Sequence, residues 1–222
     1  MTFAERLKDR ARPILAAQLD HPFVQGLADG TLSLDRFRYY MIQDTLYIVA
    51  YARTIAWAAA LVPEAEQAMR MLDSARETFE IETALKETYF AEFGVTMEEV
   101  LGTEPAPTCT AYMDHLHRYT RVGVLAEAMA AIIPCGYIYV EIGRELTGGR
   151  DLAQEHPYRS WLMTYALPEL RETVDWWFEV LDRAAAGKPE AELAPIESIF
   201  LRSCRYEWMF WDMAWNLETW RP

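Results

Sequence analysis

The chain has 222 residues, of which 52% are hydrophobic and 25% are charged, a composition typical of a folded globular protein. Its 34 Asp and Glu residues outnumber its 21 Lys and Arg residues, which gives a formal net charge of −13. A surface of that sign repels nucleic acid and anionic lipid headgroups, so we expect neither nucleic acid nor a membrane as a partner.

The first residues and the cysteines favour a reducing compartment. Charged residues such as Glu5 and Arg6 stand where a signal peptide would be apolar. The three cysteines, Cys109, Cys135 and Cys204, are odd in number and form no Cys-x-x-Cys pair. We therefore expect a soluble cytoplasmic protein with free thiols, and for each thiol a small buried hydrophobic role is the commonest outcome.

Helical periodicity runs through the chain, and the alternation typical of strands is nearly absent. Most of the 10 glycines and 11 prolines fall between the periodic stretches. No linker, repeat or shift in composition divides the sequence, so we expect one all-α domain over residues 1–222. The expected helices are Phe3–Leu19, Ser33–Leu61, Glu64–Phe93, Thr108–Arg121, Val124–Leu146, Pro157–Ala166, Leu167–Ala186 and Pro195–Asn216.

The expected helix Ser33–Leu61 is apolar nearly all round after Ile42, which predicts a central place in a helical bundle. Asp44 interrupts its inward row, and Tyr47 lies one turn further on. An ionised acceptor beside an aromatic face suits a flat heterocycle that bears an amine. A structural aspartate capped by the tyrosine explains the same spacing, and spacing alone slightly favours it.

The expected helix Val124–Leu146 repeats this pattern with a thiol. Its inward row contains Cys135 and, one turn on, Tyr139. Pro134 removes a backbone hydrogen bond of the helix directly before the cysteine. An inward thiol in this setting is a candidate nucleophile if a neighbour favours the thiolate, although a buried apolar cysteine is the commoner outcome.

The last expected helix places Glu207 in the centre of an apolar stripe, with Arg202, Arg205 and Asp212 on the opposite face. Burial without a cation raises the pKa of a carboxyl group, so Glu207 should hold or exchange a proton near neutral pH. A general acid needs that property. A buried glutamate that joins two helices through hydrogen bonds fits the pattern equally well.

Motifs for metals and nucleotides are missing from the sequence. His115 and His117 are two residues apart, so they do not share a helix face, and no Glu-x-x-His pair exists. There is no Gly-x-Gly-x-x-Gly, Walker or Gly-x-Ser-x-Gly motif. We therefore expect no metal and no cofactor.

Three separated segments carry longer motifs. They are HPFVQGLADGTL at 21–32 with FRYYMIQD at 37–44, PCGYIYVEIG at 134–143 and YEWMFWDMA at 206–214. In this order they resemble the TenA family, the thiaminase II proteins, and the resemblance extends over nearly the whole chain.

This resemblance implies a single-domain helical bundle with the heme oxygenase fold but without heme, assembled as a homotetramer. It implies an aminopyrimidine aminohydrolase that releases 4-amino-5-hydroxymethyl-2-methylpyrimidine from degraded thiamin and from thiamin itself, so that the partner is a small pyrimidine substrate. Position by position, it implies that Cys135 is the nucleophile, Glu207 its acidic partner and Asp44 the acceptor for the pyrimidine's amine. The pocket tyrosines that it implies are Tyr47, Tyr112, Tyr139 and Tyr165.

The resemblance leaves two other classes of function open. Some family members are labelled transcriptional enhancers, which suggests a regulatory or ligand-binding protein without catalysis, but a net charge of −13 disfavours direct contact with DNA. A cofactor-dependent oxidase on the same fold would need a cluster of His and Glu ligands. The choice of substrate among thiamin, the aminomethyl pyrimidine and formylated relatives also stays open, since Gly136 and Leu46 stand where relatives often carry bulkier residues.

Overall fold

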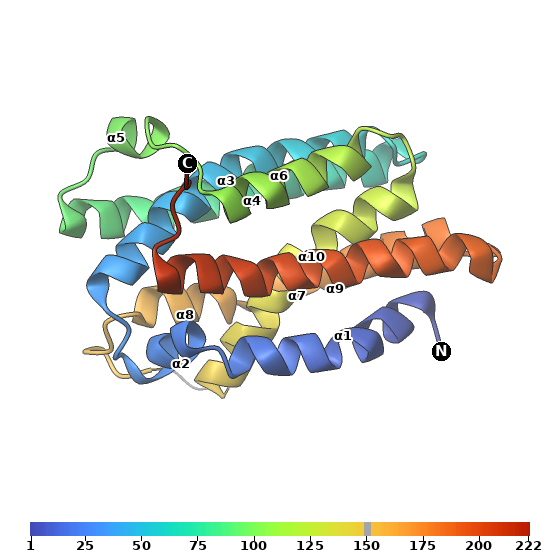
Figure 1. Ribbon diagram of the computed structural model, residues 1–222. Coiled ribbons are helices and arrows are strands. Elements are labelled where there is room, and N and C mark those ends of the chain that lie inside the picture. The colour runs from blue at the N-terminus through green and yellow to red at the C-terminus, as the bar shows by residue number, and fades with distance from the viewer. Residues whose placement is uncertain (149–151) are drawn as a thin grey trace.

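The computed structural model describes residues 1–148 and 152–222, with side chains at all these positions except 82, 84, 87 and 88. Within these ranges all regular secondary structure is helical, as the periodicity predicts (Figure 1). The helices are α1 (Phe3–Leu19), α2 (Pro22–Asp29), α3 (Leu34–Ala59), α4 (Ala65–Phe93), α5 (Met97–Leu101), α6 (Pro107–Thr120), α7 (Leu125–Thr147), α8 (Arg159–Tyr165), α9 (Pro168–Ala185) and α10 (Glu190–Asn216).

The start of α10 differs from the prediction. We expected Pro195 to begin this helix, but it begins at Glu190 and continues through the proline. Proline favours a helix start because the first N–H groups have no partner within the helix, yet one missing bond further on does not end the helix when other interactions support it. Glu190 and Glu192 in the first turn supply such support, because negative charge is stabilising at a helix N-terminus.

Two short helices, α2 and α5, were not predicted, because they are too short for a hydrophobic period to show. Each has a clear cap instead. In α2 the His21 Nδ1 accepts a hydrogen bond from the Phe23 N–H at 3.1 Å, and Gly30 ends the helix with a φ of 76°. In α5 the pair Thr96 and Glu99 forms a capping box.

Helix α7 is the central element of the bundle. It contacts α1, α3, α6, α8, α9 and α10, and Figure 1 shows it crossing beneath α10. By length and hydropathy it could cross a membrane, but 83% of its most apolar window is buried within the protein. Core packing therefore accounts for its apolar composition.

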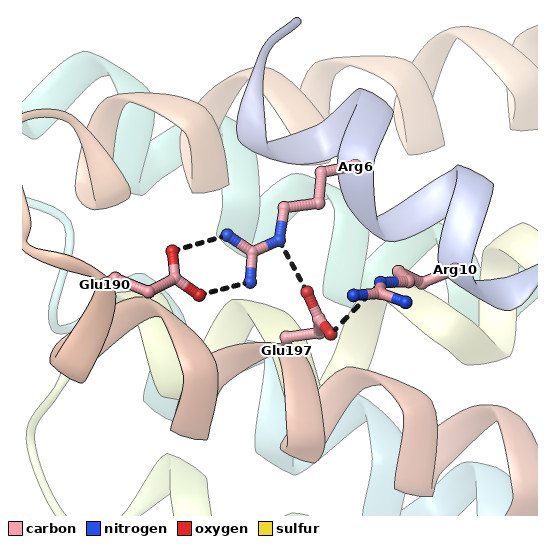
Figure 2. Close-up of polar contacts among 4 residues, drawn as sticks. All are labelled: Arg6, Arg10, Glu190 and Glu197. Carbon is pink, nitrogen blue, oxygen red and sulfur yellow. Dashed lines mark hydrogen bonds and ion pairs between the residues drawn. The ribbon is translucent and has the colours of Figure 1, made fainter.

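An ion-pair network fastens α1 to the beginning of α10 at the molecular surface (Figure 2). The Arg6 guanidinium donates two hydrogen bonds to Glu190, at 2.6 and 2.7 Å, and a third from Nε to Glu197 at 2.6 Å. Arg10 Nε lies 3.6 Å from the second carboxylate oxygen of Glu197. The network lies in the N-terminal half of α10, whereas Glu207 lies in its C-terminal half. It therefore fastens the helix at a distance from the buried carboxyl group.

Candidate active site

A cavity lies among α3, α4, α7, α8 and α9. Its empty volume is about 600 Å³, part of it open to solvent. Most of its wall is apolar. The lining residues that matter for chemistry are Asp44 and Tyr51 from α3, Cys135 and Tyr139 from α7, and Tyr165 from α8.

Four of the predicted site residues therefore meet in this candidate cavity, namely Asp44, Cys135, Tyr139 and Tyr165. The rings of Tyr139 and Tyr165 have centroids 4.7 Å apart. Gly143, one turn after Tyr139, makes this contact achievable, because a Cβ there would lie 2.5 Å from the backbone carbonyl carbon of Tyr165. Only a glycine lets the backbone of α8 approach α7 so closely.

The other three predicted residues, Tyr47, Tyr112 and Glu207, do not line the candidate cavity but form a layer behind it. Tyr47 stacks on the lining residue Tyr51 with centroids 5.6 Å apart and on Tyr112 at 4.9 Å. The Tyr112 hydroxyl donates a hydrogen bond to Glu207. A chain of aromatic rings thus connects the buried carboxyl group to the wall of the cavity.

Glu207 is buried, as its place in the apolar stripe predicts. Burial raises the pKa of this carboxyl group to about 8, the hydrogen bond from Tyr112 opposes the rise, and the nearby charge of Asp44 adds to it. Burial also raises the pKa of the wall residues Tyr51 and Tyr139 well above the usual range. Glu207 therefore carries its proton at neutral pH, and these two tyrosines stay neutral as well.

The three thiols have different surroundings. All are buried, but only Cys135 lines the candidate cavity. Burial raises the pKa of the Cys109 thiol to about 12 and also raises the pKa of Cys204, so these two groups stay protonated. The buried apolar role expected for Cys109 and Cys204 agrees with this geometry.

Tyr51 is a site residue that the sequence patterns did not single out. Its hydroxyl hydrogen bonds with the Cys135 side chain and donates to the backbone carbonyl of Ile132 at 2.9 Å. Tyr51 belongs to the same inward row as Asp44. Its spacing therefore placed it near the candidate site but gave no reason to distinguish it from residues that only pack.

Helix α7, which carries Cys135, is continuous across Pro134.

Lys86 is the second residue that the patterns missed. Its Nζ lies 2.8 Å from Asp44 Oδ2, and both side chains are buried. A partial signal lies in α4, where Phe79, Thr83, Lys86 and Phe90 form a row at 4-3-4 spacing, so that the lysine shares a face with two phenylalanines. This row is more polar than the row around Asp44, so it gives less reason to expect the lysine in the core.

The space beside Gly136 is filled by side chains of α9. A Cβ at this residue would lie 2.9 Å from Val174 Cγ2 and 3.6 Å from the Trp177 ring. These side chains of α9 therefore occupy the space in which a larger residue would stand.

No three His, Cys, Asp or Glu side chains in the described parts of the chain gather as a metal-ligand set. The acid–base groups of the site are thus a thiol, two carboxyl groups, tyrosines and one lysine.

The fold places the protein in the class of heme oxygenase-like helical bundles. A domain with a heme oxygenase-like fold from Shewanella denitrificans matches it with a TM-score of 0.73 at 15% identity, over 96% of this chain and 92% of that one. The TenA homologue from P. horikoshii OT3 matches with a TM-score of 0.86 at 27% identity, over 97% of this chain and 99% of that one.

Sequence comparison gives the family. The chain is 37% identical over 221 residues to the aminopyrimidine aminohydrolase of Halalkalibacterium halodurans. The alignment covers 99% of this chain and 98% of that protein. The TENA/THI-4/PQQC family pattern matches residues 8–217. The chain belongs to the TENA/THI-4/PQQC family.

Proposed function

We propose that the protein is an aminopyrimidine aminohydrolase of the thiaminase II type that serves thiamin salvage. It would release 4-amino-5-hydroxymethyl-2-methylpyrimidine from aminopyrimidine products of thiamin degradation and from thiamin. The name of the Halalkalibacterium halodurans relative supports this activity. The observation that carries the proposal is the presence of Asp44 and Cys135 in one cavity, with the buried acid Glu207 behind its wall.

The pyrimidine ring lies against the tyrosine faces of the cavity, and its amino group donates to the Asp44 carboxylate. Tyr139 and Tyr165 provide aromatic surface from α7 and α8. Tyr51 adds a third ring from α3, which the stacked rings of Tyr47 and Tyr112 support from behind, and the Tyr112 hydroxyl donates a hydrogen bond to Glu207. A flat, amine-bearing heterocycle meets both an apolar surface and an ionised acceptor in this arrangement.

The reaction begins with a proton from Glu207 to a ring nitrogen, which makes the neighbouring ring carbon electrophilic. This step requires the bound pyrimidine to reach past the tyrosine layer to within hydrogen-bond distance of Glu207. The Cys135 thiolate forms a bond to that carbon, and the electron pair pushed through the ring expels the amine, or the thiazole of thiamin, from the exocyclic methylene. Water then adds to the methylene carbon, and one of its protons passes to the released amine or, when thiamin is the substrate, to the solvent. The carbon–sulfur bond breaks, the ring becomes aromatic again and the proton returns to Glu207.

The experiment compares release of the hydroxymethyl pyrimidine from thiamin and from the aminomethyl pyrimidine by the wild type and by Cys135→Ser. We expect turnover by the wild type and its loss in the variant, with pyrimidine binding kept. Cys109→Ser is the matched control, because this thiol lies outside the cavity and a serine can still donate to the Gln43 carbonyl that Cys109 Sγ meets at 3.6 Å. Turnover by Cys135→Ser would exclude the nucleophile.

We also propose that the protein works as a cytoplasmic homotetramer. Large hydrophobic side chains on α4, namely Met69, Leu72 and Phe79, are exposed, and burial of such a face between copies would remove it from water. Light scattering on the purified protein measures the mass directly. A monomer at working concentration would contradict the assembly, and activity confined to the membrane or secreted fraction would contradict the location.

A further inference from the structure

Lys86 and Asp44 form a buried ion pair in the wall of the candidate cavity. Nζ lies 2.8 Å from Oδ2, and the two side chains are 2% and 5% exposed. Lys86 comes from α4 and Asp44 from α3, which pack along each other. The carboxylate assigned to substrate recognition thus has an ammonium group in direct contact with it.

The pair separates two cavities. Asp44 lines the candidate cavity, Lys86 lines a second cavity among α3, α4 and α5, and Ile48 lines both. Lys86 is not a lining residue of the candidate cavity. A ligand there meets the carboxylate first, with the ammonium on its far side.

Stability alone does not explain the pair. Taking an ammonium and a carboxylate out of water costs free energy that their attraction only partly offsets, so a hydrophobic pair of similar volume would serve the helix contact as well. Lysine is almost never buried unless it is paired. The charge of Lys86 therefore calls for an explanation in terms of what binds in the cavity.

That charge changes the electrostatics of binding. Among the described residues of the cavity wall, Asp44 has the only carboxylate, and the ammonium behind it balances its charge. The wall tyrosines Tyr51 and Tyr139 stay neutral because burial raises the pKa of each well above its usual range. A cation that approaches Asp44 is thus opposed by a like charge in a region of low dielectric, whereas a neutral amine donates to Asp44 without that opposition.

We propose that Lys86 is a positioning residue that tunes substrate specificity: it holds the Asp44 carboxylate from behind and offsets part of its charge, so that the site attracts cationic aminopyrimidines, relative to neutral ones, less strongly than Asp44 alone would. The formylated aminomethyl pyrimidine is neutral, whereas thiamin carries a thiazolium and the aminomethyl pyrimidine carries an ammonium near neutral pH. The inference rests on the proposed function and narrows its substrate class.

The first test measures kcat/KM for thiamin and for the formylated pyrimidine in the wild type, Lys86→Gln and Lys86→Arg. Glutamine removes the charge but keeps an N–H donor for Asp44, and arginine keeps both. We expect kcat/KM for thiamin divided by kcat/KM for the formylated pyrimidine to rise on the order of tenfold in Lys86→Gln. In Lys86→Arg this ratio should stay at the wild-type value. An unchanged ratio in Lys86→Gln would overturn the proposal, because a purely structural lysine would lower both values together.

A second pair of variants repeats the charge change without the carboxylate, in case Lys86→Gln is too unstable to assay. The step from Asp44→Asn to the double variant Asp44→Asn/Lys86→Gln also removes one positive charge, and we expect it to favour the cation in the same way.

For this pair the ratio is read from the affinities of thiamin and of the neutral hydroxymethyl pyrimidine by calorimetry, which requires no turnover. Absence of turnover in the wild type would therefore contradict the proposed function, whereas an affinity ratio that does not move would contradict the role of Lys86.

Discussion

Carboxylates are held by hydrogen-bond donors in two regions of this molecule, one at the surface and one in the core. At the surface, Arg6 joins Glu190 and Glu197 where α1 meets α10 (Figure 2). In the core, Lys86 contacts Asp44 and Tyr112 donates to Glu207. The same chemical group therefore occurs in two environments within one chain.

Water explains the difference between these regions. The hydrogen bonds of Arg6 lower the pKa of the exposed Glu190, whereas burial raises the pKa of Glu207 to about 8. A hydrated carboxylate beside a guanidinium stays an anion and can hold two helices together. A dehydrated carboxyl group beside a phenol keeps its proton and can give it to a ligand.

The largest expected effect comes from Glu207→Gln, which removes the acidic proton from the buried member of this comparison. Glutamine fits the site and can accept from Tyr112 but has no proton to transfer, so we expect kcat to fall about 100- to 10,000-fold while the fold is kept. Steady-state kinetics and circular dichroism measure the two quantities. Glu197→Gln, at the surface, is the control and should keep wild-type kcat; a Glu207→Gln variant at full rate would remove the acid from the mechanism.

The pH dependence of activity is the next effect. Since the acid acts in its protonated form and burial raises its pKa to about 8, the ratio of kcat/KM in the wild type to kcat/KM in Glu207→Gln should fall as pH rises through about 8, by about tenfold for each further pH unit. The ratio cancels the pH dependence of the Cys135 thiolate, which both proteins share. A ratio that stays constant from about pH 7 to about pH 10 would contradict the assignment of Glu207.

Stability should also depend on the buried acid. Glu207 has an ordinary pKa of 4.5 when unfolded and about 8 when folded, so between these values the unfolded chain has lost a proton that the folded protein keeps. Stability from this group is fully present below pH 4.5 and is lost as pH rises towards 8.

Relative to Glu207→Gln, the unfolding free energy of the wild type should therefore fall by up to about 1.4 kcal/mol for each pH unit in that window. Urea unfolding of both proteins at several pH values gives this difference. Parallel curves for the two proteins would show that Glu207 titrates at its ordinary pKa.

The smallest effect is expected at the surface. Arg6→Ala should lower the melting temperature by no more than a few degrees and leave kcat unchanged, because exposed ion pairs contribute little to stability. About 1 M salt should remove most of the difference by screening. Thermal melts at low and high salt measure it, and a large loss that salt does not alter would mean that Arg6 stabilises the bundle by packing instead.

The sequence indicated those candidate residues that interrupt an apolar row. Asp44, Cys135 and Glu207 each stand in such a row, so helical spacing alone indicates that they point inward. Tyr112 and Tyr165 came from the family resemblance and not from spacing.

Lys86 shows why other residues near the cavity were not predicted. Its contact with Asp44 depends on the register between α3 and α4, which no spacing within one helix encodes. The first turn of α10 was not predicted for a different reason. Pro195 is a strong signal for a helix start, and the acidic residues before it override that signal.

The close approach at Gly143 has a consequence for how the site can diversify. Because the backbone of α8 rests directly on α7 there, the spacing of Tyr139 and Tyr165 is set by main chain and not by side-chain rotamers. The part of the wall that α9 contributes consists of side chains, including Leu170 and Val174. Changes in the size of the accepted substrate should therefore arise on the α9 wall, while the tyrosine wall stays constant.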